Sequence, residues 1–115
     1  MKTTKILYML WVTDMVRAVA FYRDVIGLNV HTQSPSWSEL TLGDSTVALH
    51  QGMNESFRMT GLSFEVDDID EACREIEAAG GSIVNSPRDG GIPGLLLAEV
   101  TDIDGNRFQL GSYGN

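Results

Sequence analysis

The sequence predicts an α+β fold built from two tandem βαβββ modules, residues 1–56 and 57–115, whose sheets form an open concave groove. Three observations predict it. The chain has 115 residues, enough for one ordinary domain or two very small halves. Each half starts with an apolar strand-like run followed by a stretch with helical periodicity. The halves also correspond to each other at a spacing of about 55 residues, which indicates a duplication.

The first module begins with a strand at residues 6–13, a run rich in β-branched and aromatic side chains. Asp14 then begins a helix, and Gly27 ends it as a C-cap. Between them, the apolar residues that recur at helical spacing are Met15, Val19, Tyr22 and Ile26. Strands follow at residues 28–32, 37–42 and 46–51. A Gly-Asp turn joins the last two as a hairpin.

The second module repeats this plan. A strand at residues 62–66 leads into a helix whose N-cap is supplied by Asp67, Asp68 or Asp70, and Gly80 ends that helix. Cys73 lies on the apolar stripe of the helix, where we expect it to be a small buried side chain. Further strands are expected at residues 82–85, 95–100 and 106–112. Residues 53–60 are the expected connector, and residues 86–94, rich in Gly and Pro, are the expected mobile loop.

The charge balance excludes several classes of partner. Eight Lys and Arg residues against sixteen Asp and Glu give a formal net charge of −8. Such a chain is a poor candidate for binding nucleic acid or an anionic membrane, and its charge favours cationic ligands or serves solubility. One cysteine allows neither an intramolecular disulfide nor a cysteine-based zinc site. The apolar run at residues 6–12 is too short for a signal peptide, so we expect a soluble cytoplasmic protein.

Three motifs carry a family resemblance. VTDMVRAVAFYRDVIGL resembles the opening signature V-x-D-x-x-x-A-x-x-F-Y-x-x-x-L-G of the vicinal-oxygen-chelate superfamily, which includes glyoxalases, bleomycin-resistance proteins and extradiol dioxygenases. FEVDDIDEACREIEAAGG resembles its second helix. DIDGNRFQL resembles its closing D-P-D-G-N-x-x-E-L, with Ile103 in place of Pro and Gln109 in place of Glu. The resemblance covers nearly the whole chain and implies the paired βαβββ fold.

The resemblance also implies where a metal ion would bind. Metalloenzymes of this superfamily place one ligand, normally His, Gln or Glu, on the first and last strand of each half. The corresponding positions here are Leu7, Ala48, Gly61 and Gln109. Only Gln109 has a side-chain atom that can bind a cation, whereas a catalytic site needs about three protein ligands. We therefore expect no metal at the usual site and no cofactor, and a typical metalloenzyme is not expected.

Strand alternation predicts which side chains line the groove, because every second residue shares a face. The expected ligand-binding residues are Leu7, Met9, Trp11, Trp37, Ala48, His50, Ser63, Glu65, Arg107 and Gln109. Thr46 and Glu39 are placed with them. The alternate residues, expected to pack beneath the helices, include Ile6, Tyr8, Leu10, Val12, Phe108 and Leu110. The resulting wall is aromatic with scattered polar groups, which is typical of a ligand pocket.

Several of these residues have two interpretations. His50 is a candidate general base or displaced metal ligand, or else a surface histidine at a strand end. Glu65 is a candidate acid–base group, or else the salt-bridge partner of Arg107. Trp11 and Trp37 either stack on a planar ligand or pack in a dimer interface.

Two functions follow. The first, resembling the bleomycin-resistance branch, is a homodimeric binding protein that sequesters a planar or cationic small molecule or natural product without metal. The alternative is a lyase-, isomerase- or dioxygenase-type enzyme of the same superfamily. It would use a displaced metal site built from His50, Glu65 and Gln109, or metal-free acid–base catalysis by His50 or Glu65. Whether the protein is an enzyme therefore stays open at this point.

Overall fold

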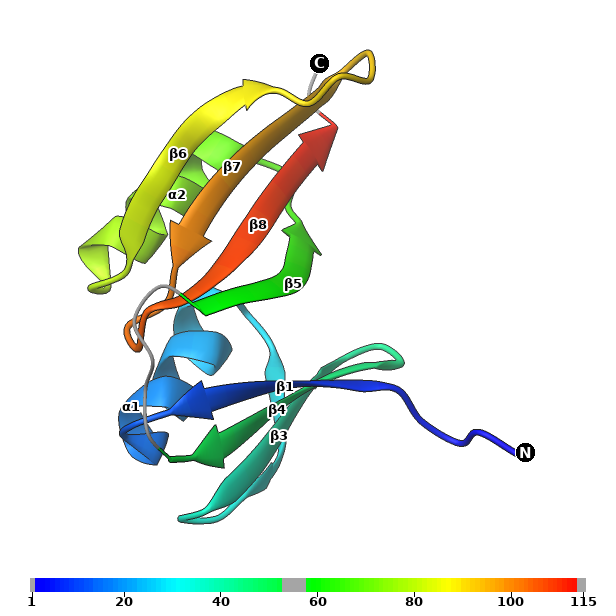
Figure 1. Cartoon of the computed structure of the whole chain (residues 1–115), viewed down its shortest axis with the longest axis vertical. Coiled ribbons are helices and arrows are strands. Elements are labelled where there is room, and N and C mark those ends of the chain that lie inside the picture. Colours follow the sequence, from blue (N-terminus) through cyan, green and yellow to red (C-terminus); the bar gives the residue numbers. More distant parts are fainter. Residues whose placement is uncertain (1, 53–57, 114–115) are drawn as a thin grey trace. The chain divides into compact units, whose positions relative to one another are not determined.

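The computed structural model describes residues 2–52 and 58–113, with the side chains of residues 58 and 59 excepted, and divides the chain into two compact units (Figure 1). Unit 1 spans Met1–Asn54 and unit 2 spans Glu55–Asn115. Each unit has one open four-stranded sheet, which confirms the predicted α+β fold of two tandem βαβββ modules. The expected boundary between residues 56 and 57 lies outside the described residues.

Unit 1 follows the order strand, helix, three strands. It consists of β1 (Leu7–Val12), α1 (Met15–Ala20), the π-helical turn η1 (Phe21–Val25), β2 (Asn29–Gln33), β3 (Trp37–Leu42) and β4 (Ser45–Gln51). The sheet order is β1-β4-β3-β2, with β1 and β4 parallel and the other neighbours antiparallel. Helix α1 packs against β3 and β4. In the part of unit 1 that the structure describes, α1 and the continuing η1 are the helical segments, and the opposite face of the sheet is open.

Unit 2 has the same arrangement, with the helix α2 covering one face of its sheet (Figure 1). It consists of β5 (Arg58–Glu65), α2 (Ile69–Ala78), β6 (Ser82–Asp89), β7 (Leu95–Thr101) and β8 (Asn106–Tyr113). The sheet order is β5-β8-β7-β6, and again the first and last strands of the unit are the parallel pair. The duplicated topology therefore accounts for the repeat seen in the sequence.

The core of each unit lies between its helix and its sheet. In unit 1 the strands contribute the fully buried side chains of Leu10, Val12, Leu40 and Leu49, which confirms the predicted alternation along β1. The expectation for Ile6 is wrong. Its side chain is 82% exposed, because the strand begins only at Leu7 and Ile6 has no partner in the sheet.

The core of unit 2 is built in the same way. Phe108 and Leu110 on β8 are buried, as predicted, and Phe108 packs edge-on against Phe64 with ring centroids 5.4 Å apart. Cys73 is buried on the inner face of α2 together with Ile76, which confirms its structural role. Burial raises the pKa of the Cys73 thiol, so this group stays protonated at neutral pH.

Both helices begin at an aspartate whose carboxylate accepts a hydrogen bond from a backbone N–H of the first turn. Asp14 accepts from Arg17 at 3.2 Å, and Asp68 accepts from Glu71 at 3.0 Å. Of the three aspartates that were candidates for the second cap, Asp68 is therefore the one that serves. Such a bond satisfies one of the N–H groups that a helix start leaves without an intrahelical partner.

Replacing Asp68 with Ala is expected to lower the free energy of unfolding by about 1 kcal/mol, because the amide of Glu71 loses its partner. Chemical denaturation followed by circular dichroism measures this. Asp67→Ala is the matched control, since its exposed side chain precedes the cap. Equal losses in the two variants would mean that the capping bond contributes nothing specific.

Three local features differ from the sequence-based expectations. Residues 58–60, expected as connector, belong to β5, while residues 53–57 lie outside the described residues. Residues 86–89, expected as part of a mobile loop, continue β6 through Pro87. The register of β6 shifts on either side of Asn85, and such irregularities let a strand accommodate a proline.

The end of the first helix is the third difference. The last turn is π-helical, with the Ile26 amide donating to the Phe21 carbonyl at 3.2 Å. Gly27 then adopts a left-handed φ of 91°, and the Leu28 amide donates to the Tyr22 carbonyl at 2.9 Å. Gly27 thus ends the helix as predicted, whereas hydrophobic spacing alone did not indicate the wider turn.

Within the described residues, no helix is long and apolar enough to cross a membrane.

Candidate ligand-binding site

Three aromatic rings meet on the open face of the unit 1 sheet. Trp11 on β1 and Trp37 on β3 are both in register with His50 on the central strand β4. The Trp11 and His50 ring centroids are 4.2 Å apart with the planes tilted by 53°. The Trp37 and His50 centroids are 5.8 Å apart with the rings perpendicular. We call these three residues the aromatic row. All three side chains are half-buried, so parts of the rings remain accessible.

The orientation of the His50 ring is fixed by the backbone. Its Nδ1 atom lies 2.9 Å from the carbonyl oxygen of Gln51. A carbonyl oxygen only accepts, so Nδ1 carries the proton that is donated. In the neutral ring Nε2 is then the atom with a lone pair, available to accept a hydrogen bond or a proton.

A carboxylate lies beside the aromatic row. Glu39, two residues along β3 from Trp37, accepts a hydrogen bond from the Trp37 indole Nε1 at 2.9 Å and pairs with the Lys5 ammonium. The Lys5 ammonium and then the Trp37 N–H hold the pKa of the Glu39 carboxyl below its usual range. Glu39 is therefore charged at neutral pH, and it fixes the orientation of the indole.

The rest of this face is an apolar shelf next to the row. Met9 and Glu39 flank Ala48 in register across the three strands, and Leu7 lies opposite Thr46. Leu7 and Met9 are 39% and 36% exposed, whereas Ala48 and Thr46 are buried and form the floor. The predicted residues of unit 1 thus lie on one face of one sheet, with apolar side chains beside three rings and one carboxylate.

The open face of unit 2 carries polar side chains beside the half-buried Leu95 and Leu97. On the paired strands β5 and β8, the Gln109 amide donates to the Ser63 hydroxyl at 3.2 Å. Arg107 donates through Nε to Glu99 on β7 at 2.8 Å. Arg88 on β6 approaches the other Glu99 oxygen at 3.4 Å. Glu99 therefore bridges two arginines across three strands.

This bridge corrects one expectation. The alternative interpretation of Glu65 was a salt bridge with Arg107, but the ion pair of Arg107 is made with Glu99. Glu65 is exposed and lies opposite Gly111, four residues along β8 from Arg107. Glu99 was not singled out from the sequence, although its alternation with the buried Ala98 and Val100 places it on the same face as Arg107.

Lowering the pH is expected to reduce the stability of the fold, because the Glu99 carboxylate becomes protonated. Hydrogen bonding and charge from Arg107, with a smaller effect from Arg88, hold the pKa of the Glu99 carboxyl below its ordinary value of 4.5. A depressed folded-state pKa means that the stabilisation is complete above about pH 4.5 and is lost as the pH falls through the folded value. The difference in Tm between the wild type and Glu99→Gln should therefore shrink below this pH. Arg107→Gln should reduce the same difference, and a constant difference down to pH 3 would contradict this role.

Of the four positions that correspond to metal ligands of the family, two lie in each unit. Leu7 and Ala48 lie on β1 and β4 of unit 1, while Gly61 and Gln109 lie on β5 and β8 of unit 2. Gly61 has a left-handed φ of 76°, in the segment where the β5 register shifts between Met59 and Ser63. In the described parts of the chain, no group of three His, Cys, Asp or Glu side chains is arranged to hold a metal ion.

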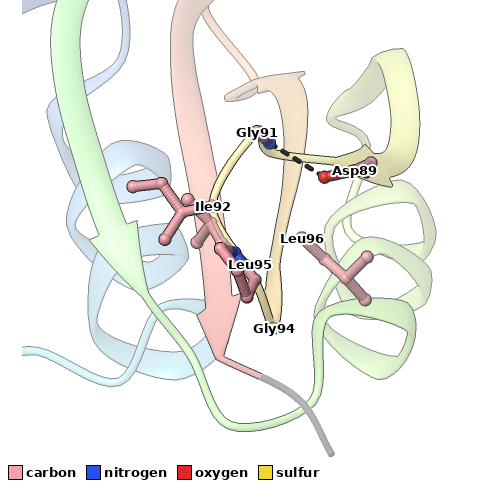
Figure 2. A pocket seen from close by; sticks show the side chains of 7 residues that line it. Asp89, Gly91, Ile92, Gly94, Leu95 and Leu96 are labelled. Carbon is pink, nitrogen blue, oxygen red and sulfur yellow. Dashed lines mark hydrogen bonds between the residues drawn. The ribbon is translucent and has the colours of Figure 1, made fainter.

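A separate pocket lies at the tip of the β6–β7 hairpin in unit 2 (Figure 2). It has a volume of about 570 Å³ and is lined by Asp89, Gly91, Ile92, Pro93, Gly94, Leu95 and Leu96. The Asp89 carboxylate accepts a hydrogen bond from the Gly91 amide at 2.8 Å, which closes the turn. None of the predicted site residues lines this pocket.

Two tandem βαβββ units, each with a helix on one face and an open face carrying the polar or aromatic groups, define the paired βαβββ class of proteins. The family model described as "Glyoxalase/Bleomycin resistance protein/Dioxygenase superfamily" matches residues 6–110. The chain belongs to this superfamily. No curated protein matches it significantly in sequence.

Several solved structures share this fold. An antibiotic-binding protein from a Streptomyces species, TnmS3, has a TM-score of 0.74 at 22% identity, with 96% of each chain covered. The fosfomycin resistance protein FosX from Listeria monocytogenes has a TM-score of 0.78 at 17% identity, covering 97% of this chain and 94% of its own. Lactoylglutathione lyase from Agrobacterium tumefaciens has a TM-score of 0.73 at 20% identity, covering 96% and 94%. The chain is thus similar in fold both to antibiotic-binding or resistance proteins and to a lyase.

Proposed function

We propose that the protein binds and sequesters a planar, cationic small molecule or natural product, without a metal ion. The observation that carries this proposal is the aromatic row, which places Trp11, His50 and Trp37 in register on one open sheet face. Partly accessible flat rings bind planar ligands by stacking, and the apolar shelf of Leu7 and Met9 extends that surface. Similarity in fold to an antibiotic-binding protein agrees with this proposal.

Charge favours a cationic ligand. The electron-rich face of an indole attracts a cation, and the strength of that attraction is greatest for tryptophan. The chain as a whole carries a net charge of −8, and this net charge favours a cation because the Glu39 carboxylate beside the Trp37 indole is already paired with Lys5. A delocalised cation is both planar and positively charged. It can therefore stack on the rings of the aromatic row and is also attracted by the negative charge of the protein.

The proposal includes no metal ion because of the side chains found at the four positions that correspond to metal ligands of the family. Leu7, Ala48 and Gly61 have no side-chain atom that can bind a cation, and Gln109 alone supplies one neutral oxygen, fewer than the about three protein ligands of a catalytic site. A homodimeric state and a cytoplasmic location, both expected from the sequence, belong to the same proposal. Analytical ultracentrifugation of the purified protein tests the homodimer.

The test of binding is a titration with proflavine, a planar cationic dye. We expect saturable quenching of the tryptophan fluorescence, with one dye bound per chain and an affinity that falls as salt is added. Pyrene-1-sulfonate, planar and anionic, is the matched probe and should bind more weakly. Elemental analysis of the same sample should find less than about a tenth of an equivalent of any divalent metal per protein chain.

Trp37→Ala should reduce proflavine binding, whereas Tyr113→Ala, which removes a 59% exposed aromatic ring from unit 2, should leave it unchanged. If neither planar probe binds the wild type at all, or if both variants behave alike, the aromatic row is not a ligand site.

The second candidate function is a metal-free proton transfer at an activated carbon. The observation that favours it is the His50 ring, whose Nδ1 is held by the Gln51 carbonyl so that Nε2 is available as a base. Glu65, exposed on β5, is the other candidate. The wild type would then catalyse exchange of the α-hydrogen of a hydroxyketone such as dihydroxyacetone for deuterium, followed by NMR. His50→Gln should abolish this exchange where His50 is the base, and Glu65→Gln should abolish it where Glu65 is the base. No exchange above the buffer rate in the wild type would remove this candidate.

A further inference from the structure

Gly52 lies just beyond the end of β4, two residues after His50. Its amide donates to the Val12 carbonyl at 2.9 Å, which extends the parallel pairing of β1 and β4 by one hydrogen bond. The backbone of Gly52 is therefore held next to the strand that carries Trp11.

The ring of Trp11 occupies the place where a side chain at position 52 would begin. A Cβ built on Gly52 would lie 2.6 Å from both Cε3 and Cζ3 of the Trp11 indole. Non-bonded carbon atoms lie at about 3.5–4.0 Å at their optimal separation, so any side chain here would displace the ring. At Gly43, in contrast, a Cβ would meet nothing within 4 Å.

Backbone conformation does not explain why residue 52 is a glycine. Seven glycines of the described chain have a positive φ, and Gly52 is not one of them. An L-residue is therefore compatible with its backbone, and the contact with Trp11 is what a side chain would disturb. The obstacle is also a side chain that can turn, unlike at Gly81, where a Cβ would lie 2.4 Å from the Thr101 carbonyl oxygen.

We propose that Gly52 is a positioning residue, whose missing side chain lets the Trp11 indole lie against the His50 imidazole in the orientation used for stacking. The inference rests on the proposed binding function. Trp11 contacts His50 with a centroid distance of 4.2 Å, so a displacement of the indole by even about 1 Å changes the shape of the aromatic row. Gly52 thereby limits which planar molecules this face accepts, without contacting them itself.

Gly52→Ala tests this in two independent ways. The first is proton NMR of the histidine rings, which needs no ligand. The chain has two histidines, His31 and His50, and the His31→Gln variant assigns their signals. Since an indole strongly shifts the resonances of protons close to its face, the His50 signals should move in Gly52→Ala while those of His31 stay. The second is proflavine affinity, which should fall about three- to tenfold, the range expected for one lost aromatic contact.

Gly43→Asn is the control, because it adds a side chain to an open turn of the same sheet, and asparagine tolerates the left-handed φ of 58° found there. It should change neither the His50 signals nor the affinity. A Trp11→Phe background supplies a second check. Phenylalanine lacks the second ring, so Gly52→Ala should move the His50 signals less in that background than in the wild type.

The outcomes separate the two proposals. Unchanged His50 signals in Gly52→Ala overturn the positioning role, and so does unchanged affinity where the wild type binds proflavine. Shifted His50 signals in a protein that binds no planar probe support the placement of Trp11 by Gly52 and reject the binding function. If Gly52→Ala does not fold, recovery of folding by Trp11→Phe supports the contact. Failure of that double variant overturns it.

Discussion

Trp11→Ala is expected to weaken proflavine binding by about 5- to 150-fold. Stacking of one flat ring on an aromatic side chain contributes about 1–3 kcal/mol, and that range of free energy corresponds to this range of affinity. The loss is larger than for Gly52→Ala because the whole ring is removed rather than displaced. Trp11 also contacts His50 directly, so its removal leaves one side of the aromatic row empty.

Isothermal titration calorimetry of the wild type and Trp11→Ala measures this effect without relying on tryptophan fluorescence. Trp11→Phe should have an intermediate affinity, because the smaller ring keeps part of the stacking face. Tyr113→Ala is again the control for loss of an exposed ring. An affinity for Trp11→Ala within a factor of two of the wild type would place the ligand elsewhere.

Leu49→Ala is expected to lower the free energy of unfolding by about 2–5 kcal/mol, the range observed for truncation of a buried leucine. Leu49 has no exposed surface and lies on the central strand β4, between Leu10 on β1 and Ser38 on β3. The truncation therefore removes packing from the middle of the unit 1 core, where the rigid sheet and α1 leave little room for collapse.

Guanidinium denaturation followed by circular dichroism gives the free energy of unfolding for the variant and the wild type. Leu42→Ala is the matched control, since Leu42 ends the neighbouring strand and is 58% exposed. We expect its effect to stay within about 0.5 kcal/mol, as for most surface substitutions. Similar losses for the two leucines would mean that Leu49 is not in a close-packed core.

Much of the fold could be predicted because its determinants are local. Alternation of apolar residues placed Leu10 and Val12 on the buried face of β1, and the aspartates before each apolar stripe marked the helix starts. The same alternation brought Trp11 and His50 to the open face, where the structure finds their rings in contact. The spacing of apolar residues along a strand or helix, and the residue that caps a helix, are both visible in a short stretch of chain. One sequence therefore suffices to detect them.

The features that sequence reasoning missed depend on how strands pair and on where side chains lie in space, rather than on periodicity along one strand. The partner of Arg107 is decided by the register of β7 against β8, which brings Glu99 rather than Glu65 within reach. The role of Gly52 depends on where the indole of a distant residue lies. Composition was also misleading at Pro87, because strand irregularities around Asn85 accommodate a residue that usually marks a loop.

The parallel pairing of first and last strands has a consequence for synthesis on the ribosome. The sheet of unit 1 is complete when β4 pairs with β1, so every strand it needs has been made once Gln51 has been added. Unit 2 extends from residue 55 to residue 115, a further 61 residues, which take about 3–12 s to translate at typical rates. During that interval the nascent chain already contains all four strands of that sheet, including those that carry Trp11 and Trp37. All the strands that carry the aromatic surface proposed for ligand binding are therefore synthesised before unit 2.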